Sequence, residues 1–339
     1  MENITAVTLT LEDINDQEIR KLLAPIVYLA ILMTVGIPGN LAVLIIYRHK
    51  YSKSVYRTII WNLALTDLVF CTLTIPFNIG RLIRYYTFTE LWICKLFTTT
   101  IVFFIMYSSH LLVTLSIHRF RQVCMPLGNQ IGPHNVKYWI IGGACLAVFL
   151  DIPQGILQPL DQVQLAQNIT GHICAVSFHT SLFAEIYNGF LTFLFSLYSL
   201  VLFVLYILIG RRMYLQRKSK QYSESSLSQS DEVSSKITKI AITISAVFAS
   251  SYVPLFVIKL LASFINQEEL TSAQFGVLKI VERSYVINHV ANPFIYAFYD
   301  SRFRREFKMM FTAAGHLPEM EGTSEERTAS KDRTLDSKL

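Results

Sequence analysis

The sequence predicts an all-helical membrane protein, in which a bundle of seven transmembrane helices precedes a short amphipathic cytoplasmic helix. Of its 339 residues, 52% are hydrophobic and 16% are charged, whereas soluble domains carry about 25% charged residues. Seven apolar segments approach or exceed the ~20 residues that cross a bilayer. The net charge of +6 comes from basic residues that lie between these segments. We therefore interpret it as a topology signal, and expect a lipid bilayer rather than a nucleic acid as the partner.

The chain divides into four predicted parts. We expect an extracellular tail over 1–21, the transmembrane bundle over 22–298, a membrane-surface helix over 300–311 and a disordered cytoplasmic tail over 312–339. The predicted spans cover about 22–47, 57–82, 92–121, 138–160, 183–211, 236–263 and 273–298. No apolar run begins at Met1, so the first span is expected to direct its own insertion.

The distribution of basic residues predicts the orientation of the bundle. Lys and Arg cluster after spans one, three and five, as in Arg48 and Lys50, Arg119 and Arg121, and Arg211 and Arg212. The alternate connections lack them between Gln154 and Leu182 and between Ala262 and Phe275. The positive-inside rule then places the N-terminus outside and the C-terminus in the cytoplasm, and we expect a multi-pass protein of the plasma membrane.

The segment after the last span has the pattern of a helix that lies on a membrane surface. Its apolar residues share one helical face and its charges take the other. The apolar face holds Phe303, Phe307, Met310 and Phe311. Such a helix is expected to lie on the inner leaflet. No cysteine follows it, so no palmitoyl anchor is expected there.

Two of the five cysteines face an oxidising compartment in this topology. Cys94 opens span three on the outer side, and Cys174 lies in the long outer connection before span five. We predict a disulfide between them that holds the outer loop over the mouth of the bundle, with two free thiols as the alternative. Asn3 and Asn168 both begin glycosylation sequons on the same side.

Motifs on separate spans carry a family resemblance. They are Gly39-Asn40, the run from Asn62 to Leu68, Cys94 with His118-Arg119-Phe120, Tyr206 with Ile209 and Met213, Phe248 with Tyr252-Val253-Pro254, and Asn292-Pro293-Phe294-Ile295-Tyr296. In this order they resemble the rhodopsin-like (class A) G-protein-coupled receptors, over about 22–311. No subfamily is assignable, and the chain looks like an orphan receptor that leans towards peptides.

Asp67 is the one acid in the middle of span two, and an ionised carboxylate at membrane depth needs a partner. By the family pattern Asp67 meets Ser108, Asn288 and Asn292. These oxygen donors with one charge would suit Na⁺, which would be the only bound cofactor. A polar network without an ion, or a protonated Asp67, is the alternative.

The resemblance also implies which residues couple the bundle to a G protein. These are His118, Arg119, Phe120, Tyr206, Phe248, Pro254, Pro293 and Tyr296. In the family the arginine locks the resting bundle and later contacts the G protein. Here His118 replaces the usual acid beside Arg119, and Ser234 stands where an acidic partner would lie. A weakened lock predicts raised signalling without ligand.

Other positions depart from the family pattern. Gly143 stands where span four usually has Trp, Tyr198 lies near the place of the usual span-five proline, and Tyr252 replaces the span-six Trp. Tyr252 keeps an aromatic ring with a polar tip, and is expected to form the floor of the pocket.

The outer halves of the spans predict the class of ligand. Ile101 occupies the position at which amine receptors carry Asp, and Val286 the position at which opsins carry the retinal-binding Lys. Neither an amine nor retinal is therefore expected. The expected pocket residues are Arg81, Ile101, Ile105, Tyr252, Phe256, Lys259, Glu282 and Tyr285, and His289 turns inward in the same span as the last two.

This pocket would be apolar at its base and charged at its mouth. The long loop that holds Cys174 favours a peptide, and an acidic lipid or a nucleotide-like small molecule is the alternative. Lys259 and Glu282 could equally form a salt bridge with each other and have no role in binding.

The predicted function is that of a receptor that opens its cytoplasmic face to heterotrimeric G proteins when an extracellular ligand binds. Ser and Thr in the third inner loop and tail would be sites for a receptor kinase, and the negative charge of the added phosphates would recruit arrestin. Ser337-Lys338-Leu339 resembles a PDZ-domain ligand, a match that chance also produces.

Two other classes of protein fit the sequence less well. An ion-coupled transporter with Asp67 as carrier is disfavoured, because the sequence has no internal repeat and no second acid in the middle of a span. An enzyme is disfavoured, because the spans carry no metal-ligand cluster or nucleophile–base pair.

Overall fold

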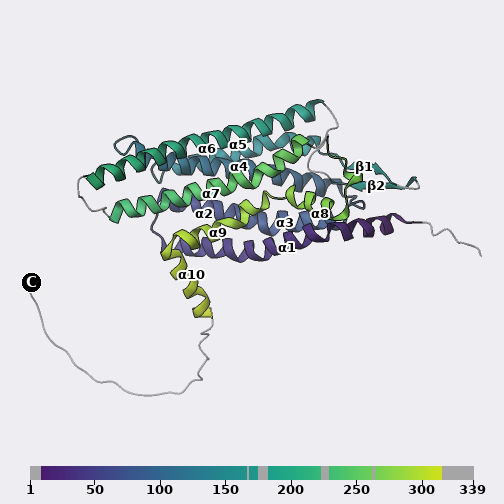
Figure 1. Ribbon diagram of the computed structural model, residues 1–339, viewed down its shortest axis with the longest axis horizontal. Coiled ribbons are helices and arrows are strands. Elements are labelled where there is room, and N and C mark those ends of the chain that lie inside the picture. The colour runs from purple at the N-terminus through teal and green to yellow at the C-terminus, as the bar shows by residue number, and fades with distance from the viewer. Residues whose placement is uncertain (1–8, 166–167, 175–181, 223–228, 262–263, 315–339) are drawn as a thin grey trace, which may run out of the picture.

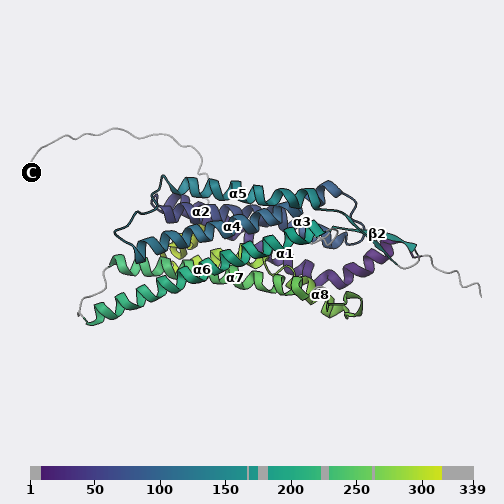
Figure 2. The same ribbon diagram turned by 90° about the horizontal axis from the view of Figure 1, so that it is seen from above.

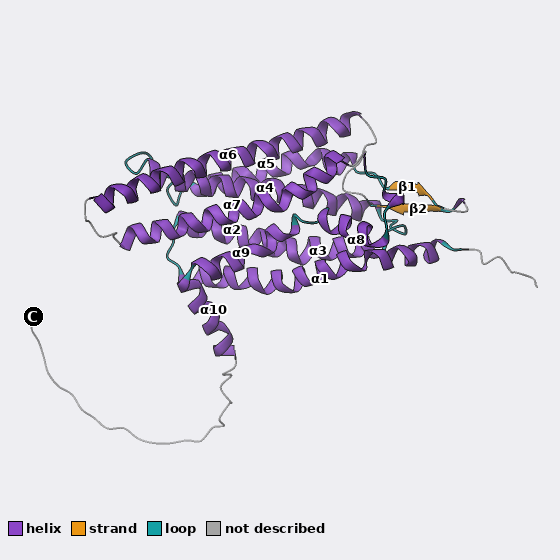
Figure 3. Ribbon diagram, in the orientation of Figure 1, coloured by secondary structure: helices purple, strands orange, loops and turns teal. Residues whose placement is uncertain are grey.

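The computed structural model describes residues 9–165, 168–174, 182–222, 229–261 and 264–314. Long helices run side by side along one axis (Figure 1). A hairpin of strands β1 (Asp161–Gln164) and β2 (Thr170–Ile173) lies at one end, and helix α10 (Ser301–Ala314) at the other. We refer to these as the hairpin end and the α10 end. Apart from the hairpin and the loops that connect the elements, the described residues are helical (Figure 3).

The helices cover the middle of each predicted span, and several run beyond its predicted ends. They are α1 (Leu11–Lys50), α2 (Val55–Val69), the π-helical turn η1 (Phe70–Thr74), α3 (Ile75–Ile83), α4 (Leu91–Cys124), α5 (Val136–Leu157), α6 (Leu182–Tyr222), α7 (Gln229–Leu261), the 3₁₀ turn η4 (Gln267–Glu269), α8 (Ser272–Val281) and α9 (Val286–Tyr299). Helices α2, η1 and α3 are continuous and together form the second span. Six stretches of the described residues are long and apolar enough to cross a membrane.

The seventh predicted span is divided between α8 and α9. These helices have 10 and 14 residues, each too short to cross a bilayer alone. Residues 282–285 form turns between them, with short-range bonds such as that from the N–H of Arg283 to the carbonyl of Ile280 at 2.9 Å. The regular helix is thus interrupted about two turns before Pro293.

Helix α1 begins at Leu11, within the segment that the sequence predicts as a tail. A capping box explains this start, because the Thr10 hydroxyl accepts from the N–H of Asp13 while the Asp13 carboxylate accepts from the N–H of Thr10. Asn15 anchors these additional N-terminal turns of α1 to the bundle. It donates to the carbonyl of Ile83 at 3.0 Å and accepts from the N–H of Tyr86 at 3.0 Å.

Helix α4 is the central helix of the bundle. It contacts α2, α5, α6 and α7, and Figure 2 shows it between α5 on one side and α7 on the other. A Cβ built at Gly143 of α5 would lie 2.0 Å from Cδ2 of His110 on α4. Nε2–H of His110 also donates to the carbonyl of Trp139 at 2.9 Å. The glycine that replaces the usual Trp therefore makes room for a histidine from α4.

A disulfide joins Cys94 at the start of α4 to Cys174, which follows β2, with 5.7 Å between the Cα atoms. The predicted pairing is confirmed. Asn168 lies exposed near the tip of the hairpin at φ 62°, a left-handed conformation that Asn tolerates. The other predicted glycosylation site, Asn3, lies outside the described residues.

Helix α10 turns away from the bundle axis (Figure 1). Phe303 is buried against Tyr47 and Tyr296, at ring-centroid distances of 6.3 and 6.0 Å. Phe307 and Met310 of the predicted apolar face are half-buried. Glu306 forms an ion pair with Lys50 at 3.4 Å. The apolar face of α10 thus packs on the ends of α1 and α9.

Candidate functional site

The carboxylate of Asp67 is fully buried where α2 meets α9. Nδ1–H of His289 donates to its Oδ1 at 2.7 Å, and Nδ2–H of Asn292 donates to its Oδ2 at 2.6 Å. The two donors are three residues apart on α9 and so lie on one helix face. Each carboxylate oxygen therefore already accepts from a nitrogen of α9.

The structure assembles the predicted ion site only in part. Asn292 contacts Asp67, but no hydrogen bond between described residues joins Ser108 or Asn288 to that carboxylate. The Ser108 hydroxyl is instead buried without a hydrogen-bond partner among the described atoms. The sequence analysis predicted that His289 faces the interior of the bundle but did not predict its contact with Asp67. Because His289 lies three residues before Asn292, on the same helix face, this spacing was a signal for the contact.

An aromatic cluster lies between this polar site and the hairpin end. Tyr252 is fully buried, and its ring lies 4.9 Å from that of Phe248 and 6.1 Å from that of Tyr285. Phe195 of α6, which the sequence did not single out, lies 5.1 Å from Tyr252 and 4.5 Å from Phe256. Tyr252 therefore packs within an aromatic cluster drawn from α6, α7 and the turn before α9.

Two further predicted pocket residues lie on α4, and one predicted switch residue lies on α7. Ile101 is buried, Ile105 is half-buried, and Pro254 lies within α7. The side chain of Lys259 is outside the described part of the structure.

Charged residues gather at the hairpin end of the same region. Glu282 pairs with Nζ of Lys279 at 3.1 Å and with a guanidinium nitrogen of Arg283 at 3.4 Å, two cations that the sequence analysis did not single out. Arg81 donates to the carbonyl of Cys174 at 3.2 Å and to Asn78 at 2.9 Å.

These charges lie close enough to act on one another. Arg81 interacts electrostatically with Glu282, Arg283 and Lys279. Lys279 and Arg283 are only 6% and 5% exposed. We call Arg81, Lys279 and Arg283 around Glu282 the cationic cluster.

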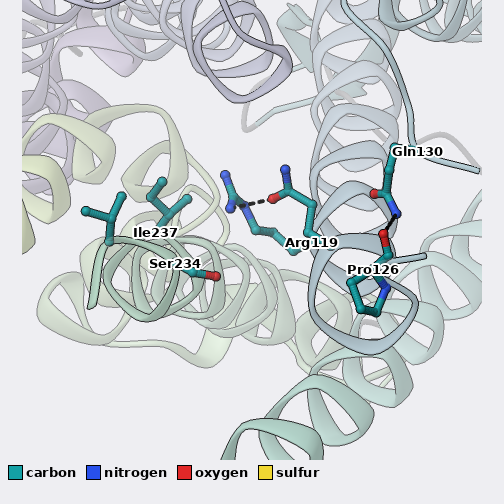
Figure 4. A pocket seen from close by; sticks show the side chains of 7 residues that line it. Arg119, Pro126, Gln130, Ser234 and Ile237 are labelled. Atoms are coloured by element: carbon teal, nitrogen blue, oxygen red, sulfur yellow. Dashed lines mark hydrogen bonds between the residues drawn. The ribbon is translucent and has the colours of Figure 1, made fainter. Parts of the chain in front are cut away.

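A cavity of about 420 Å³ opens at the α10 end, between α4 and α7 (Figure 4). Its lining is Arg119, Gln122, Pro126, Gln130, Val233, Ser234 and Ile237, with no acid among these residues. Arg119 is 3% exposed, donates to Oε1 of Gln122 at 2.8 Å and lies 4.9 Å from the ring centroid of Tyr56. Beside it on α4, His118 is buried and Phe120 is half-buried.

The two tyrosines of the predicted switch have different surroundings. The Tyr206 hydroxyl accepts from Ser116 of α4 at 2.7 Å and from Ser245 of α7 at 3.2 Å, so it holds three helices together. The Tyr296 hydroxyl is buried without a hydrogen-bond partner among the described atoms, and its ring lies 5.5 Å from that of Tyr47.

The structure also corrects one argument made from the sequence. Asp151 of α5 is 6% exposed, so Asp67 is not the only acid buried within a spanning helix. The scarcity of acids therefore does not distinguish a receptor from a transporter, and a different observation is needed to distinguish them.

Comparison with known proteins supplies that observation. The profile of the family described as 7 transmembrane receptor (rhodopsin family) matches residues 39–296. The chain is 24% identical over 287 residues to neuropeptide Y receptor type 1 of Xenopus laevis, covering 81% of this chain and 77% of that receptor. It is 27% identical over 308 residues to somatostatin receptor type 5 of Rattus norvegicus, covering 85% and 77%. For chemokine XC receptor 1 of Mus musculus the identity is 23% over 295 residues, covering 85% and 83%.

The seven-span bundle and the match over most of its length define a multi-pass membrane receptor. The chain belongs to the rhodopsin family of seven-transmembrane receptors. Within that family α8 and α9 together form the seventh span. Its relatives are receptors rather than transporters or enzymes.

Proposed function

We propose that this chain is a plasma-membrane receptor for an extracellular peptide that carries an acidic group. The hairpin end faces outwards and the α10 end faces the cytoplasm, as the positive-inside rule and the amphipathic α10 support. The names of its relatives, which include receptors for neuropeptide Y, somatostatin and angiotensin II, support a peptide ligand.

The cationic cluster is the observation that supports an acidic group on the ligand. Three cations around one carboxylate leave two positive charges in excess among the described residues. The nearby Glu18 of α1 does not neutralise them, because it pairs with Lys21 at 2.8 Å. The Nε atoms of Arg81 and Arg283 are buried without hydrogen-bond partners among the described atoms. An anionic group at this end would supply both the missing charge and the missing acceptors.

Binding at the hairpin end would shift a two-state bundle towards the form with an open α10 end. The cavity lined by Arg119 is where a heterotrimeric G protein would then engage. A receptor kinase and arrestin would act on Ser and Thr of the third inner loop and the tail, and a PDZ domain would bind the last residues. The predicted sites in the tail lie outside the described residues.

A peptide screen with a promiscuous G-protein readout tests this proposal. Matched peptides with a free C-terminal carboxylate, with an amidated C-terminus, and with or without Asp or Glu side chains would locate the acidic group. An acidic lipid or a nucleotide-like molecule offers the same chemistry, so these compounds form a separate arm of the screen.

Substitutions in the cluster then test the site itself. Arg283→Gln and Arg81→Gln should each lower agonist potency about 10–100-fold, since each removes a charge-assisted bond. Arg84→Gln is the matched control, because Arg84 is exposed at the same end and pairs with Glu90. Equal potency for free-acid and neutral agonists, unchanged by both substitutions, would refute an anion-binding role.

A further inference from the structure

We propose that His289 replaces the sodium ion of the family pattern, so that Asp67 is held by a side chain of this protein and Na⁺ does not bind there. The imidazole of His289 is fully buried, and its Nδ1–H donates to Oδ1 of Asp67 at 2.7 Å. The resting bundle then needs no cation to stabilise this carboxylate. This inference concerns the centre of the bundle and does not depend on which ligand the receptor senses.

The donor set around Asp67 does not fit Na⁺. A hard cation takes oxygen ligands, several at once. Here the two described partners of the carboxylate are N–H groups, from His289 and Asn292. The Asn292 amide turns its nitrogen, not its oxygen, towards Asp67. Neither N–H group can coordinate a metal ion while it donates to the carboxylate.

The surroundings of His289 hold its ring in this position. The ring stacks on Phe70 of η1, with centroids 3.8 Å apart and planes 19° apart. Phe104 of α4 approaches the same ring edge to face, at 6.4 Å. A ring enclosed in this way cannot swing aside for an ion without unpacking both aromatic neighbours.

The backbone of His289 is also fixed. Its carbonyl accepts from Nδ2–H of Asn40 on α1 at 2.9 Å and from the thiol of Cys71 at 3.7 Å. The π-helical turn η1 supplies both Cys71 and Phe70, so its irregular geometry contributes two of the contacts that hold the histidine. With Asp67 of α2, five elements thus meet at one residue: α1, α2, η1, α4 and α9.

Thermal unfolding of the purified receptor tests this inference with Na⁺ itself as the probe. We expect the same melting temperature in NaCl, KCl and choline chloride at equal ionic strength. His289→Ser removes the N–H donor and supplies an oxygen instead, so this variant should gain a saturable, Na⁺-selective rise of about 2–4 °C.

The double variant His289→Ser with Asp67→Asn should lose the response that the single variant gains, since the charge that attracts the ion is gone. A saturable, Na⁺-selective rise in the melting temperature of the unsubstituted receptor would overturn the inference, even if no variant folds. A folded His289→Ser receptor that shows no Na⁺ response would also contradict it. Signalling is not the readout, so the result is separate from the fate of the peptide proposal.

Discussion

At the scale of single residues, Arg119 shows how this receptor holds a buried cation without a carboxylate. Its described partners are the neutral side chain of Gln122 and the ring face of Tyr56. A cation over an aromatic ring contributes about 0.5–2 kcal/mol, depending on exposure. Removing one partner of a buried ion pair costs about 3–5 kcal/mol, because the other charge is left unpaired. Arg119 can exchange its described neutral partners without leaving a carboxylate unpaired, and in this it differs from an arginine held in an ion pair.

This difference predicts the effect of adding an acid to the cavity. Ser234→Glu places a carboxylate in the lining that faces Arg119. We expect agonist-independent signalling to fall by a factor of about 2–5, which corresponds to about 0.5–1 kcal/mol from one partly solvated ion pair. The measurement is second-messenger output at matched surface expression. Ser234→Gln has the same length without charge, and a similar fall in that variant would assign the effect to size rather than charge.

The sequence predicted the positions of some functional residues but not all of their contacts. The motifs placed Asp67, Arg119 and Asn292 in the bundle by position, and the topology paired Cys94 with Cys174. The partner of Asp67 could not be predicted in the same way. The family pattern placed Ser108 and Asn288 beside it and did not include His289. Which side chain contacts Asp67 depends on how η1 and the break before α9 orient the two helices.

At the scale of the elements, hydropathy located the middle of every span but not the ends. The extra turns of α1 are polar and depend on the Thr10–Asp13 capping box and on Asn15, so an apolar-run criterion cannot find them. The break between α8 and α9 lies in an apolar segment with no Gly or Pro at residues 282–285. A tertiary contact marks it instead, because the Ser284 hydroxyl donates to the carbonyl of Ser251 on α7 at 2.6 Å.

The contact between α4 and α5 gives a prediction at this scale. Gly143→Ala should lower the free energy of unfolding by about 1–3 kcal/mol, because its Cβ would overlap the His110 ring that also bonds to Trp139. Gly142→Ala is the matched control. A Cβ at Gly142 would have no atom within 4 Å, and Ala is favoured over Gly in a helix by about 1 kcal/mol. Equal melting temperatures for the two variants would contradict the proposed packing role of Gly143.

At the scale of the whole molecule, the structure separates two chemically different ends. The hairpin end gathers cations beneath a disulfide-tethered loop, and the α10 end has a cavity with Arg119 in its lining. Between them, a fully hydrogen-bonded Asp67 and the aromatic cluster around Tyr252 fill the middle of the bundle. A signal from one end to the other must pass through this packed centre, which is why the pairing of His289 with Asp67 matters for the resting state.

Nucleotide exchange on purified heterotrimeric G proteins tests the central claim most directly. The purified receptor in lipid nanodiscs should accelerate exchange above the rate of the G protein alone, even without agonist. Arg119→Ala should remove this acceleration while leaving the receptor folded. If a folded, unsubstituted receptor failed to accelerate exchange on any member of a G-protein panel, with or without an agonist from the peptide screen, the assignment as a G-protein-coupled receptor with a weakly held resting state would be contradicted.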